Sequence, residues 1–450
     1  MKVAIIGGGI TGCAAYLELR KHLAETELFS GSHEITIYEA NDTRHWVSPV
    51  YLEQDPTHSS KLIVGGGLGI SPNGLSVLQR LHEGLLQDIT RSGHVISHYN
   101  FKNKHGNLLM RVDHNGHSES GLGTPSKKLN IVASSRHSLW ISLRALIPDQ
   151  DIVCRKRVSR VITHPERRNI IEFADGSQPA DADLVIGADG VGSIVRKALF
   201  LDTAEDQYPP HYEGFVEIGG YIPALGIAEL IQRGSMNFIL GGKGWFSYCF
   251  SDNNPSDPTR DSPYLVSEPG ETIGWWFTYE SKECPDYNTV NMDDVSRQLQ
   301  ERFAQCNDPV IRRVIASALV TKVYPTWTSP PLTTWEGDGV VLLGDAAHAL
   351  PPASIQGISQ ALEDCESFAL FMEHQLKRME MNPSFTDKEA IVEAARQYID
   401  LRKPRVTMIL ESERRSQNSK REMGAIREYA MYSMFKFLGR LASCSFQSRS

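Results

Sequence analysis

The chain has 450 residues, of which 22% are charged, 41% hydrophobic and 8% aromatic. These are ordinary globular values, so they exclude a wholly disordered or low-complexity chain. The net charge of −8 disfavours a non-specific nucleic-acid-binding protein, which would carry a basic excess. No run is long and apolar enough to predict a membrane-spanning helix.

The cysteines and the first residues indicate the compartment. The seven cysteines form no Cys-x-x-Cys pair and no cluster with histidine at metal-ligand spacing, so we expect free thiols and no metal site. Free thiols are typical of a reducing compartment. The apolar run of residues 3–6 leads directly into glycines, which leaves no room for the core of a signal peptide. We therefore expect a cytoplasmic protein.

The first forty residues predict a βαβ unit. Residues 3–6 are continuously apolar, as in a strand buried on both faces. A glycine-rich turn at residues 7–12 leads into a helix from Cys13 to Arg20. A second strand at residues 35–38 ends at Glu39.

The next part of the chain is predicted to contain loops, helices and strands. Residues 41–64 are polar and predict a loop, and the apolar spacing from Leu75 to Leu86 predicts a helix. Residues 100–130 predict a hairpin followed by a polar loop. A helix is expected at 138–146, and alternating strands at 152–175.

The second half of the chain contains two buried-strand patterns, an aromatic-rich region and a helical end. A buried strand is expected at 183–187, and short aromatic-rich strands over 210–330 predict a mostly antiparallel sheet. The buried-strand pattern returns at 340–343. Three helices are expected in the remainder, at 358–377, 388–401 and 406–441.

The glycine-rich turn predicts a dinucleotide site. The first glycine of Gly7-x-Gly9-x-x-Gly12 permits a tight turn, the second lets a pyrophosphate approach the backbone, and the third lets helix and sheet pack closely. Glu39 can accept hydrogen bonds from ribose hydroxyls and would repel a 2′-phosphate, which favours FAD or NAD over NADP here. The candidate residues of this unit are Gly7, Gly9, Ile10, Thr11, Gly12 and Glu39.

Two later strand ends favour FAD over NAD. Asp189-Gly190 follows the strand at 183–187, and Gly344-Asp345 follows the strand at 340–343. Gly357-Ile358 then opens a further helix. Open α/β sheets bind ligands beyond the carboxyl ends of their strands. Three such ends suit a long cofactor that extends across one sheet.

These motifs resemble the GxGxxG, DG and GD fingerprints of the class A FAD-dependent monooxygenases, which have the para-hydroxybenzoate hydroxylase fold. Residues 65–73 resemble the GAGIGLSPN segment of that family, Arg136 resembles its arginine before the third helix, and Tyr398-x-x-x-Arg402-x-Pro404-Arg405 resembles its YxxxRxPR motif. The resemblance covers about residues 1–410. It is greatest to salicylate-hydroxylase-like and fungal secondary-metabolite members.

The resemblance implies an α/β fold with a Rossmann-like FAD-binding domain, an inserted, mostly antiparallel substrate sheet and a C-terminal helical region. We expect the FAD-binding domain to be discontinuous, at 1–200 and 335–400. The substrate domain is expected at 201–334 and the helical tail at 401–450. FAD would be bound tightly, and NAD(P)H would act as a transient electron donor.

The resemblance also assigns roles by position. The backbone of Val158 would contact adenine, Arg136 would approach the ribityl-pyrophosphate region, and Asp345 would bind the ribityl hydroxyls. The helix that begins near Gly357 and Ile358 would aim its N-terminus at the flavin, where reduced flavin is anionic. The Asp189-Gly190 pair would serve both FAD and NAD(P)H.

Three departures from the family pattern affect these expectations. Residues 40–64 form an unusually long insertion near the flavin or its entrance. Ile355 and Ser359 replace a small residue and an asparagine. Residues 218–221, Ile-Gly-Gly-Tyr, replace a Trp-Arg-Gly segment and remove an arginine that could pair with a substrate carboxylate.

The resemblance implies a monooxygenase that uses NAD(P)H and O2. It would hydroxylate or epoxidise an aromatic or electron-rich secondary metabolite, of polyketide or indole type, through a flavin C4a-hydroperoxide. No catalytic base is evident; Tyr221, Tyr248 and His211 are weak candidates. Another flavin oxidoreductase on the same scaffold, such as an oxidase or Baeyer–Villiger-type enzyme, is the alternative. A non-catalytic dinucleotide-fold binding protein is less favoured.

Some residues have simpler interpretations. We expect His348 to serve loop packing, because no carboxylate partner is spaced for a triad, and Asp364 to be an acid on a helix face. The apolar tail at 429–441 could lie on a membrane surface. Packing on its own protein, or on a partner in a homodimer, is the favoured interpretation; a monomer is equally compatible.

Overall fold

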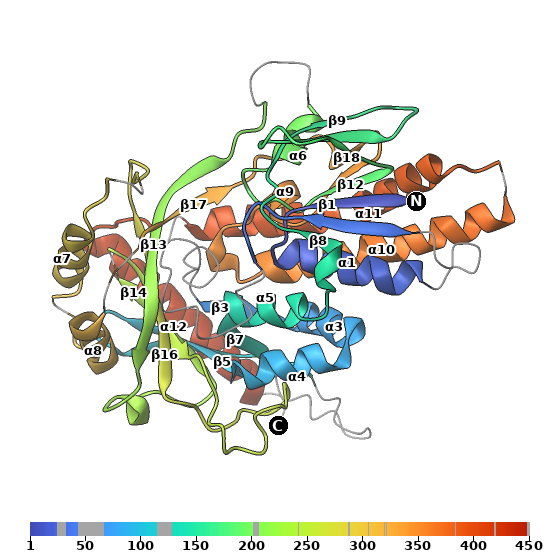
Figure 1. Cartoon of the computed structure of the whole chain (residues 1–450). Helices are drawn as coiled ribbons and strands as arrows, with labels where there is room; N and C mark the ends of the chain where they lie inside the picture. Colours follow the sequence, from blue (N-terminus) through green and yellow to red (C-terminus); the bar gives the residue numbers. More distant parts are fainter. Residues whose placement is uncertain are drawn as a thin grey trace.

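The computed structural model describes most of the chain (Figure 1). The described residues are 1–24, 33–43, 67–114, 128–200, 207–241, 243–286, 289–304, 306–318, 320, 322–382, 384–417 and 420–447. The predicted loop at 41–64 lies outside this part beyond Thr43, as do Gly65 and Gly66 of the GAGIGLSPN-like segment.

A six-stranded sheet, here called the cofactor sheet, carries the three motifs. Its order is β18 (Glu336–Gly337), β19 (Val340–Leu342), β12 (Leu184–Gly187), β1 (Lys2–Ile6), β2 (Glu34–Tyr38) and β8 (Ile152–Val153). All neighbours are parallel except β18 and β19. The carboxyl ends of β1, β12 and β19 therefore lie at the same edge of the sheet.

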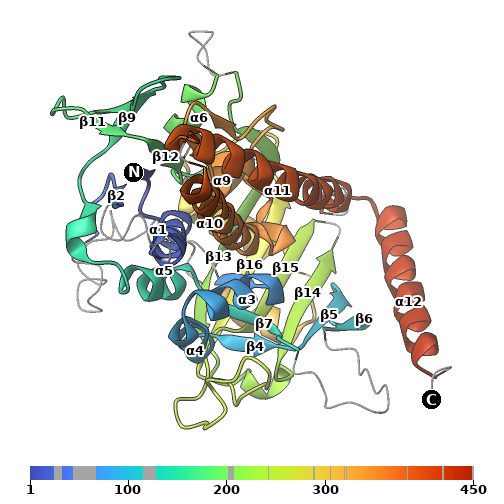
Figure 2. The ribbon, with the colours of Figure 1, turned by 90° about the vertical axis from the view of Figure 1, so that its right-hand side faces the viewer.

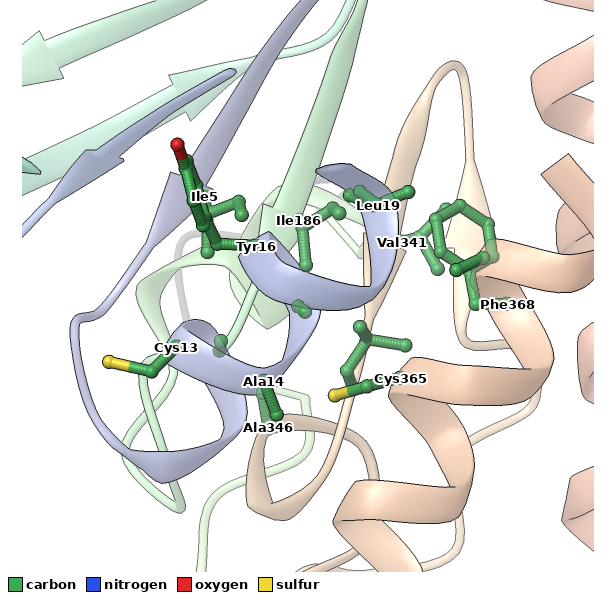
Figure 3. Packing of buried hydrophobic residues seen from close by; sticks show 14 of the residues in the cluster. Ile5, Cys13, Ala14, Tyr16, Leu19, Ile186, Val341, Ala346, Cys365 and Phe368 are labelled. Atoms are coloured by element: carbon green, nitrogen blue, oxygen red, sulfur yellow. The ribbon is translucent and has the colours of Figure 1, made fainter. Parts of the chain in front are cut away.

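Helices α1 (Ile10–Leu23) and α10 (Gly357–Met381) cover one face of the cofactor sheet (Figures 1 and 3). The core contains Ile5 and Ile186 from the strands, Leu19 from α1 and Phe368 from α10, each almost fully buried. Burying one such side chain contributes about 1.5–3 kcal/mol. The strands with continuous apolar runs thus lie in a sheet that helices cover, as the sequence predicts.

Shorter elements complete this part of the molecule. One three-stranded sheet contains β3 (Gly67–Ile70), β7 (Ile131–Ser135) and β4 (His94–Ile96), and another contains β11 (Ala180–Ala182), β10 (Asn169–Phe173) and β9 (Val158–Ile162). The helices are α3 (Pro72–Leu81), α4 (Glu83–Arg91), α5 (Arg136–Arg144), α6 (Ile194–Ala198), α9 (Asp345–His348) and α11 (Asp387–Gln417).

A seven-stranded sheet, here called the large sheet, forms the second layer. Its order is β17 (Tyr324–Thr328), β13 (His211–Pro223), β16 (Thr272–Glu280), β15 (Gly244–Phe250), β14 (Ser235–Gly241), β5 (His98–Asn103) and β6 (Leu108–Asp113). Only the β14–β5 pair is parallel. The predicted, mostly antiparallel sheet is confirmed. It also takes β5 and β6 from the chain segment expected to lie in the FAD-binding domain.

The large sheet has two different faces. Helices α7 (Met292–Arg302) and α8 (Pro309–Ser317) cover the outer face, where Phe246 and Phe277 pack into one cluster. On the inner face Cys249 and the half-buried Trp276 pack near Ile355, which precedes α10. Because side chains alternate along a strand, one residue shift decides which face a side chain occupies.

Two helix boundaries differ from those expected. The predicted helix at 75–86 is divided at His82, whose extended backbone ends α3 and whose side chain accepts a hydrogen bond from Gly84 N at the start of α4. The predicted break near Pro404 is also wrong, because α11 continues through this proline to Gln417. Packing against α10 outweighs the hydrogen bond that proline removes. The helix expected at 406–441 is not continuous: its first part belongs to α11, and a further helix begins at Ala425.

The last helix, α12 (Ala425–Gln447), lies beside β6 at the edge of the large sheet (Figure 2). Met431 is buried there, with Tyr432 and Phe435 packed against the same cluster. Other apolar residues of α12, such as Ile426 and Phe437, are exposed. No helix in the described part of the chain is both long and apolar enough to cross a membrane.

Candidate functional site

The turn after β1 is shaped by two glycines. Gly7 has a φ of 106°, and a Cβ atom there would lie 2.5 Å from the carbonyl oxygen of Ala188. A Cβ atom at Gly12 would lie 1.9 Å from the carbonyl oxygen of Gly7. The turn therefore packs against the end of β12 with no space for a side chain at either position.

Three other glycines line open space at the same edge. A Cβ atom at Gly9, Gly190 or Gly357 would have no neighbouring atom within 4 Å. Gly9 precedes α1, and Gly357 is the first residue of α10. Helix N-termini present free N–H groups and partial positive charge. The edge thus combines free space with backbone donors.

Glu39 is held rigidly at the end of β2. Its Oε2 accepts a hydrogen bond from Gly8 N at 2.7 Å, and its Oε1 accepts hydrogen bonds from the backbone N and Nδ2 of Asn41, both at 2.8 Å. The backbone of Lys156 bonds to Glu39 O, which brings the segment before Val158 alongside. Glu39 is only 9% exposed but keeps unused lone pairs for ribose hydroxyls.

Trp140 is a residue of this site that sequence reasoning missed. It lies on α5, and its indole N–H donates to Gly8 O at 2.8 Å. Arg136 begins the same helix and is exposed. No local signal links Trp140 to the glycine turn, because the contact arises from tertiary packing alone.

Asp189 connects the second strand end to α6. Its Oδ2 accepts hydrogen bonds from Ile194 N at 2.7 Å and from Val195 N at 3.2 Å. Its Oδ1 is buried and has no hydrogen-bond partner among the described residues. Burial raises the pKa of this carboxyl despite the hydrogen bonds.

Arg196 ties the second motif to the third. Its buried guanidinium donates to Val191 O at 2.6 Å and to Ala346 O at 3.1 Å. Thr11 joins the first motif to the third, because a Cβ atom at Gly344 would lie 2.7 Å from Thr11 Oγ1. The ends of β1, β12 and β19 are thus locked together by short-range contacts.

A buried ionic cluster supports the third motif and corrects two expectations. Asp364 Oδ2 accepts hydrogen bonds from Gly344 N at 3.0 Å and from His348 Nε2 at 2.5 Å, and Asp364 Oδ1 accepts one from Arg402 Nε at 2.9 Å. Asp364 is fully buried. His348 therefore has a carboxylate partner, and Asp364 is not a surface acid of its helix. The partners of Asp364 lie 16, 20 and 38 residues away along the chain, so no local sequence pattern marks them.

The cluster shifts the pKa of each partner. Burial alone would lower the pKa of His348, but Asp364 outweighs this effect and raises it. Burial alone would raise the pKa of Asp364, but His348 and Arg402 hold it below its ordinary value. The charged groups thus fix the turn at Gly344. Asp345 is half-buried; its backbone O accepts a hydrogen bond from Ser329 Oγ at 3.2 Å, but its carboxylate makes no hydrogen bond or ion pair to any described residue.

The start of α10 is backed by a strained isoleucine. Ile355 has a φ of 56°, in the left-handed region that a β-branched side chain rarely adopts. A Cβ atom at Gly69 would lie 2.4 Å from Ile355 Cγ2. Ser71 N donates to Ser359 Oγ at 3.1 Å, and Gln356 Nε2 donates to Ser71 Oγ at 3.0 Å. The residues that depart from the family pattern therefore form one network.

The residues at this edge fit FAD. The glycine cradle at Gly9 and Gly190 leaves the space that a pyrophosphate needs. Asp189 Oδ1 and the Asp345 carboxylate are acceptors with no partner among the described residues, as the hydroxyls of an extended cofactor require. The roles predicted for Gly7, Gly9, Ile10, Thr11, Gly12, Glu39, Arg136, Val158, Asp189, Gly190, Gly344, Asp345, Gly357 and Ile358 stay predictions.

The three weak catalytic candidates lie in different places. Tyr221 is 40% exposed, beside Gly274 and Gly67, and burial raises its pKa to about 12. Tyr248 lies on the outer face, where its hydroxyl contacts Lys102 and Asp308. His211 is exposed and lines a groove rich in proline at the start of β13. The structure does not bring the three together.

The described cysteines are not paired in disulfides. Six cysteines, at positions 13, 154, 249, 284, 306 and 365, are free. Within the described ranges no group of three or more histidine, cysteine, aspartate or glutamate side chains could hold a metal ion.

The chain is similar to known monooxygenases. It is 26% identical over 418 residues to 3-amino-4-hydroxybenzoate 2-monooxygenase of Streptomyces cremeus, covering 92% of this chain and 86% of the relative. It is 25% identical to 6-hydroxynicotinate 3-monooxygenase of Pseudomonas fluorescens, covering 81% and 80%. No family model matches the chain.

Solved structures show the same fold. Klebsiella pneumoniae HpxO complexed with FAD and uric acid has a TM-score of 0.69 at 19% identity, covering 97% of this chain and 92% of that one. A salicylate hydroxylase substrate complex has a TM-score of 0.67 at 20% identity, covering 97% and 93%. The likenesses confirm the predicted resemblance to class A flavoprotein monooxygenases, the fold, and the assignment as an FAD-dependent oxidoreductase.

Proposed function

We propose that the chain is an NAD(P)H-dependent FAD monooxygenase that adds one oxygen atom to a small, electron-rich aromatic compound. One observation carries this proposal. Three motif-bearing strand ends meet at one edge of the cofactor sheet, through the contacts of Gly7 with Ala188 and of Thr11 with Gly344. A long cofactor is the ligand that needs all three ends at once.

The residues of the edge would share the binding of FAD. The backbone at Gly9 and the N-terminus of α1 would hold the pyrophosphate, and Glu39 would accept from the ribose. Asp189 and Asp345 would accept from hydroxyls further along the cofactor. Bound FAD would supply the redox chemistry and the activation of O2, while the chain provides orientation and excludes water. The oxygen-activation step expected from the sequence stays a prediction.

The inner face of the large sheet would supply the substrate wall. Trp276, Cys249 and Met236 lie there against Ile355, so the wall is largely apolar and adjoins the start of α10. Two relatives are named for hydroxylated aromatic acids, 3-amino-4-hydroxybenzoate and 6-hydroxynicotinate. These names support an aromatic substrate that bears a hydroxyl group.

The test is direct. The purified protein should be yellow, and extraction should yield FAD. It should oxidise NADH or NADPH faster when a phenol, hydroxypyridine, indole or aromatic polyketide from a panel is present, and mass spectrometry should find a product one oxygen atom heavier. Colourless protein that stays free of added FAD would contradict the proposal. Substrate-dependent formation of hydrogen peroxide with no oxygenated product would favour the oxidase alternative.

A further inference from the structure

A small cavity lies between the large sheet and the loop that follows α9. Its free space of about 10 Å³ admits about one oxygen-sized group, and its lining consists of Phe215, Glu217, Thr278, Thr326, Pro351, Pro352 and Lys420. The prolines follow the Gly344-Asp345 motif in sequence, so the cavity adjoins the proposed cofactor edge. None of its ionisable side chains belongs to the motifs that predict FAD binding.

Lys420 contributes a buried positive charge to this cavity. It lies between α11 and α12, outside the sequence motifs that resemble the family, and is only 3% exposed. Its ammonium makes no hydrogen bond to the described residues; the nearest carboxylate oxygen, Glu413 Oε2, is 4.0 Å away. The ammonium also lies 5.4 Å from the ring centroid of Trp245. A buried ammonium with unused donors costs free energy unless a ligand supplies an acceptor.

Glu217 contributes the opposite charge from β13. Its Oε1 accepts a hydrogen bond from Thr278 Oγ1 at 3.1 Å, and it makes no ion pair with Lys420 or any other described residue. Burial raises the pKa of the Glu217 carboxyl, against the hydrogen bond from Thr278 and the charges of Lys420 and Arg136. Burial lowers the pKa of Lys420, against the charges of Glu413 and Glu217. The pKa values of both groups are therefore closer to that of a weakly acidic hydroxyl than they would be in water.

The two side chains together select the chemistry of a ligand. A carboxylate would satisfy Lys420 but would be repelled by Glu217 and has no proton to donate. An ammonium group would satisfy Glu217 but would be repelled by Lys420. A phenolic or enolic hydroxyl can donate to the carboxylate and place its oxygen on the ammonium, so it satisfies both.

We propose that this cavity binds the ionisable hydroxyl of an aromatic or enolic substrate, with Glu217 accepting its proton and Lys420 holding the resulting oxyanion. The substrate O–H bond breaks, an O–H bond forms on Glu217, and no charge enters or leaves the cavity. The oxyanion makes the ring more electron-rich, as attack on an electrophilic oxygen requires. The inference rests on the proposed function, because it takes the ligand to be the substrate.

Equilibrium binding to the FAD-loaded, oxidised protein tests the inference without turnover. The probes are 4-nitrophenol, whose phenolate alone absorbs in the visible region, and 4-nitroanisole, which has no ionisable proton. At a pH just below the pKa of free 4-nitrophenol, the wild-type protein should bind it at least about tenfold more tightly than 4-nitroanisole, a difference of about 1.4 kcal/mol. The bound probe should be phenolate, with no proton released to a weak buffer.

Two variants separate the two roles. Lys420→Met keeps the length of the side chain but removes the charge, so the phenolate signal and the tenfold preference should be lost. Glu217→Gln keeps the shape but cannot accept a proton, so phenolate should still bind, and the buffer should receive the protons that the free probe carries at this pH, somewhat more than half a proton per bound probe. Arg415→Met and Glu411→Gln change exposed charges at the end of α11 and should match the wild type in both readouts.

Three results would overturn the inference: equal affinity of the wild type for both probes, phenolate bound by Lys420→Met, or the same proton release from wild type and Glu217→Gln. The thermal unfolding midpoint of each variant shows whether it has folded. If Lys420→Met does not fold, the proton release of Glu217→Gln still tests the inference. FAD content and NAD(P)H oxidation are measured separately. A protein that oxygenates only compounds without a hydroxyl would therefore retain the proposed function and lose this inference.

Discussion

The cofactor edge and the Glu217–Lys420 cavity are neighbours, but they are built in different ways. The edge is built from backbone: the turn at Gly7, the open space at Gly9 and the locked strand ends. The cavity is built from side chains on β13, on β16 and on the segment between α11 and α12. A cofactor common to many enzymes needs a fixed backbone with a few carboxylates such as Glu39, whereas a particular substrate needs particular side chains throughout its site.

This difference predicts how each region responds to substitution. A side chain added at Gly7 or Gly12 of the edge meets the backbone, which cannot move without disturbing the strands. A side chain changed in the cavity alters charge and volume while the sheet persists. The first kind of change should remove cofactor and stability, and the second should alter only which ligand binds.

The largest expected effect is a loss of stability on substitution of Gly12 that substitution of Gly9 does not cause. Gly12→Ala places a Cβ atom 1.9 Å from Gly7 O, so we expect a loss of about 4 kcal/mol in unfolding free energy and no bound FAD. Gly9→Ala meets open space, so the apoprotein should unfold as the wild type does while its affinity for FAD falls at least about tenfold. Thermal unfolding and flavin absorbance per protein measure both. Equal stability of the two variants would show that the turn is not packed as described.

The buried cluster behind the edge should give the next largest effect. Asp364→Asn leaves Arg402 and His348 facing an amide, so unfolding free energy should fall by about 3 kcal/mol. The lowered pKa of Asp364 contributes stability above about pH 4 that is lost as pH falls. The raised pKa of His348 contributes below about pH 6.5 and is lost as pH rises.

The difference between wild type and Asp364→Asn should therefore be largest between about pH 4 and 6.5. Urea unfolding at a series of pH values measures it. Glu366→Gln, which alters a more exposed ion pair of the same helix with Arg80, is the matched control and should change stability by less than about 1 kcal/mol. A difference that is constant with pH would show that the cluster is not ionised.

The same contrast explains what the sequence could predict. The strand, turn and helix around Gly7 are contiguous, so hydrophobic pattern and glycine spacing predict them together, and the short aromatic-rich strands over 210–330 predict most of the large sheet. Trp140, Asp364 and Lys420 act across long sequence separations, and no local pattern marks their partners. The break at His82 was missed because apolar spacing continues across it.

A smaller effect tests the strained residue Ile355. Gly69→Ala directs a Cβ atom at Ile355 Cγ2 and should cost about 2 kcal/mol of unfolding free energy. In the double variant with Ile355→Gly this clash is gone and the strain at φ 56° is relieved. Most of the cost of Gly69→Ala should then disappear. A double-mutant cycle of thermal or urea unfolding measures the coupling, and strictly additive effects would contradict the contact.

The smallest effect distinguishes the two faces of the large sheet. Tyr248→Phe removes a hydroxyl that accepts a hydrogen bond from Lys102 at 3.0 Å on the outer face, so unfolding free energy should fall by about 1 kcal/mol. Probe binding should be unchanged, because the outer face is covered by α7 and α8. Tyr221→Phe, whose ring lies beside Gly274 and Gly67, is the matched change and should leave stability within about 0.5 kcal/mol. If Tyr248→Phe weakened 4-nitrophenol binding while preserving stability, the outer face would have to take part in ligand binding, and the separation of a structural face from a ligand face would fail.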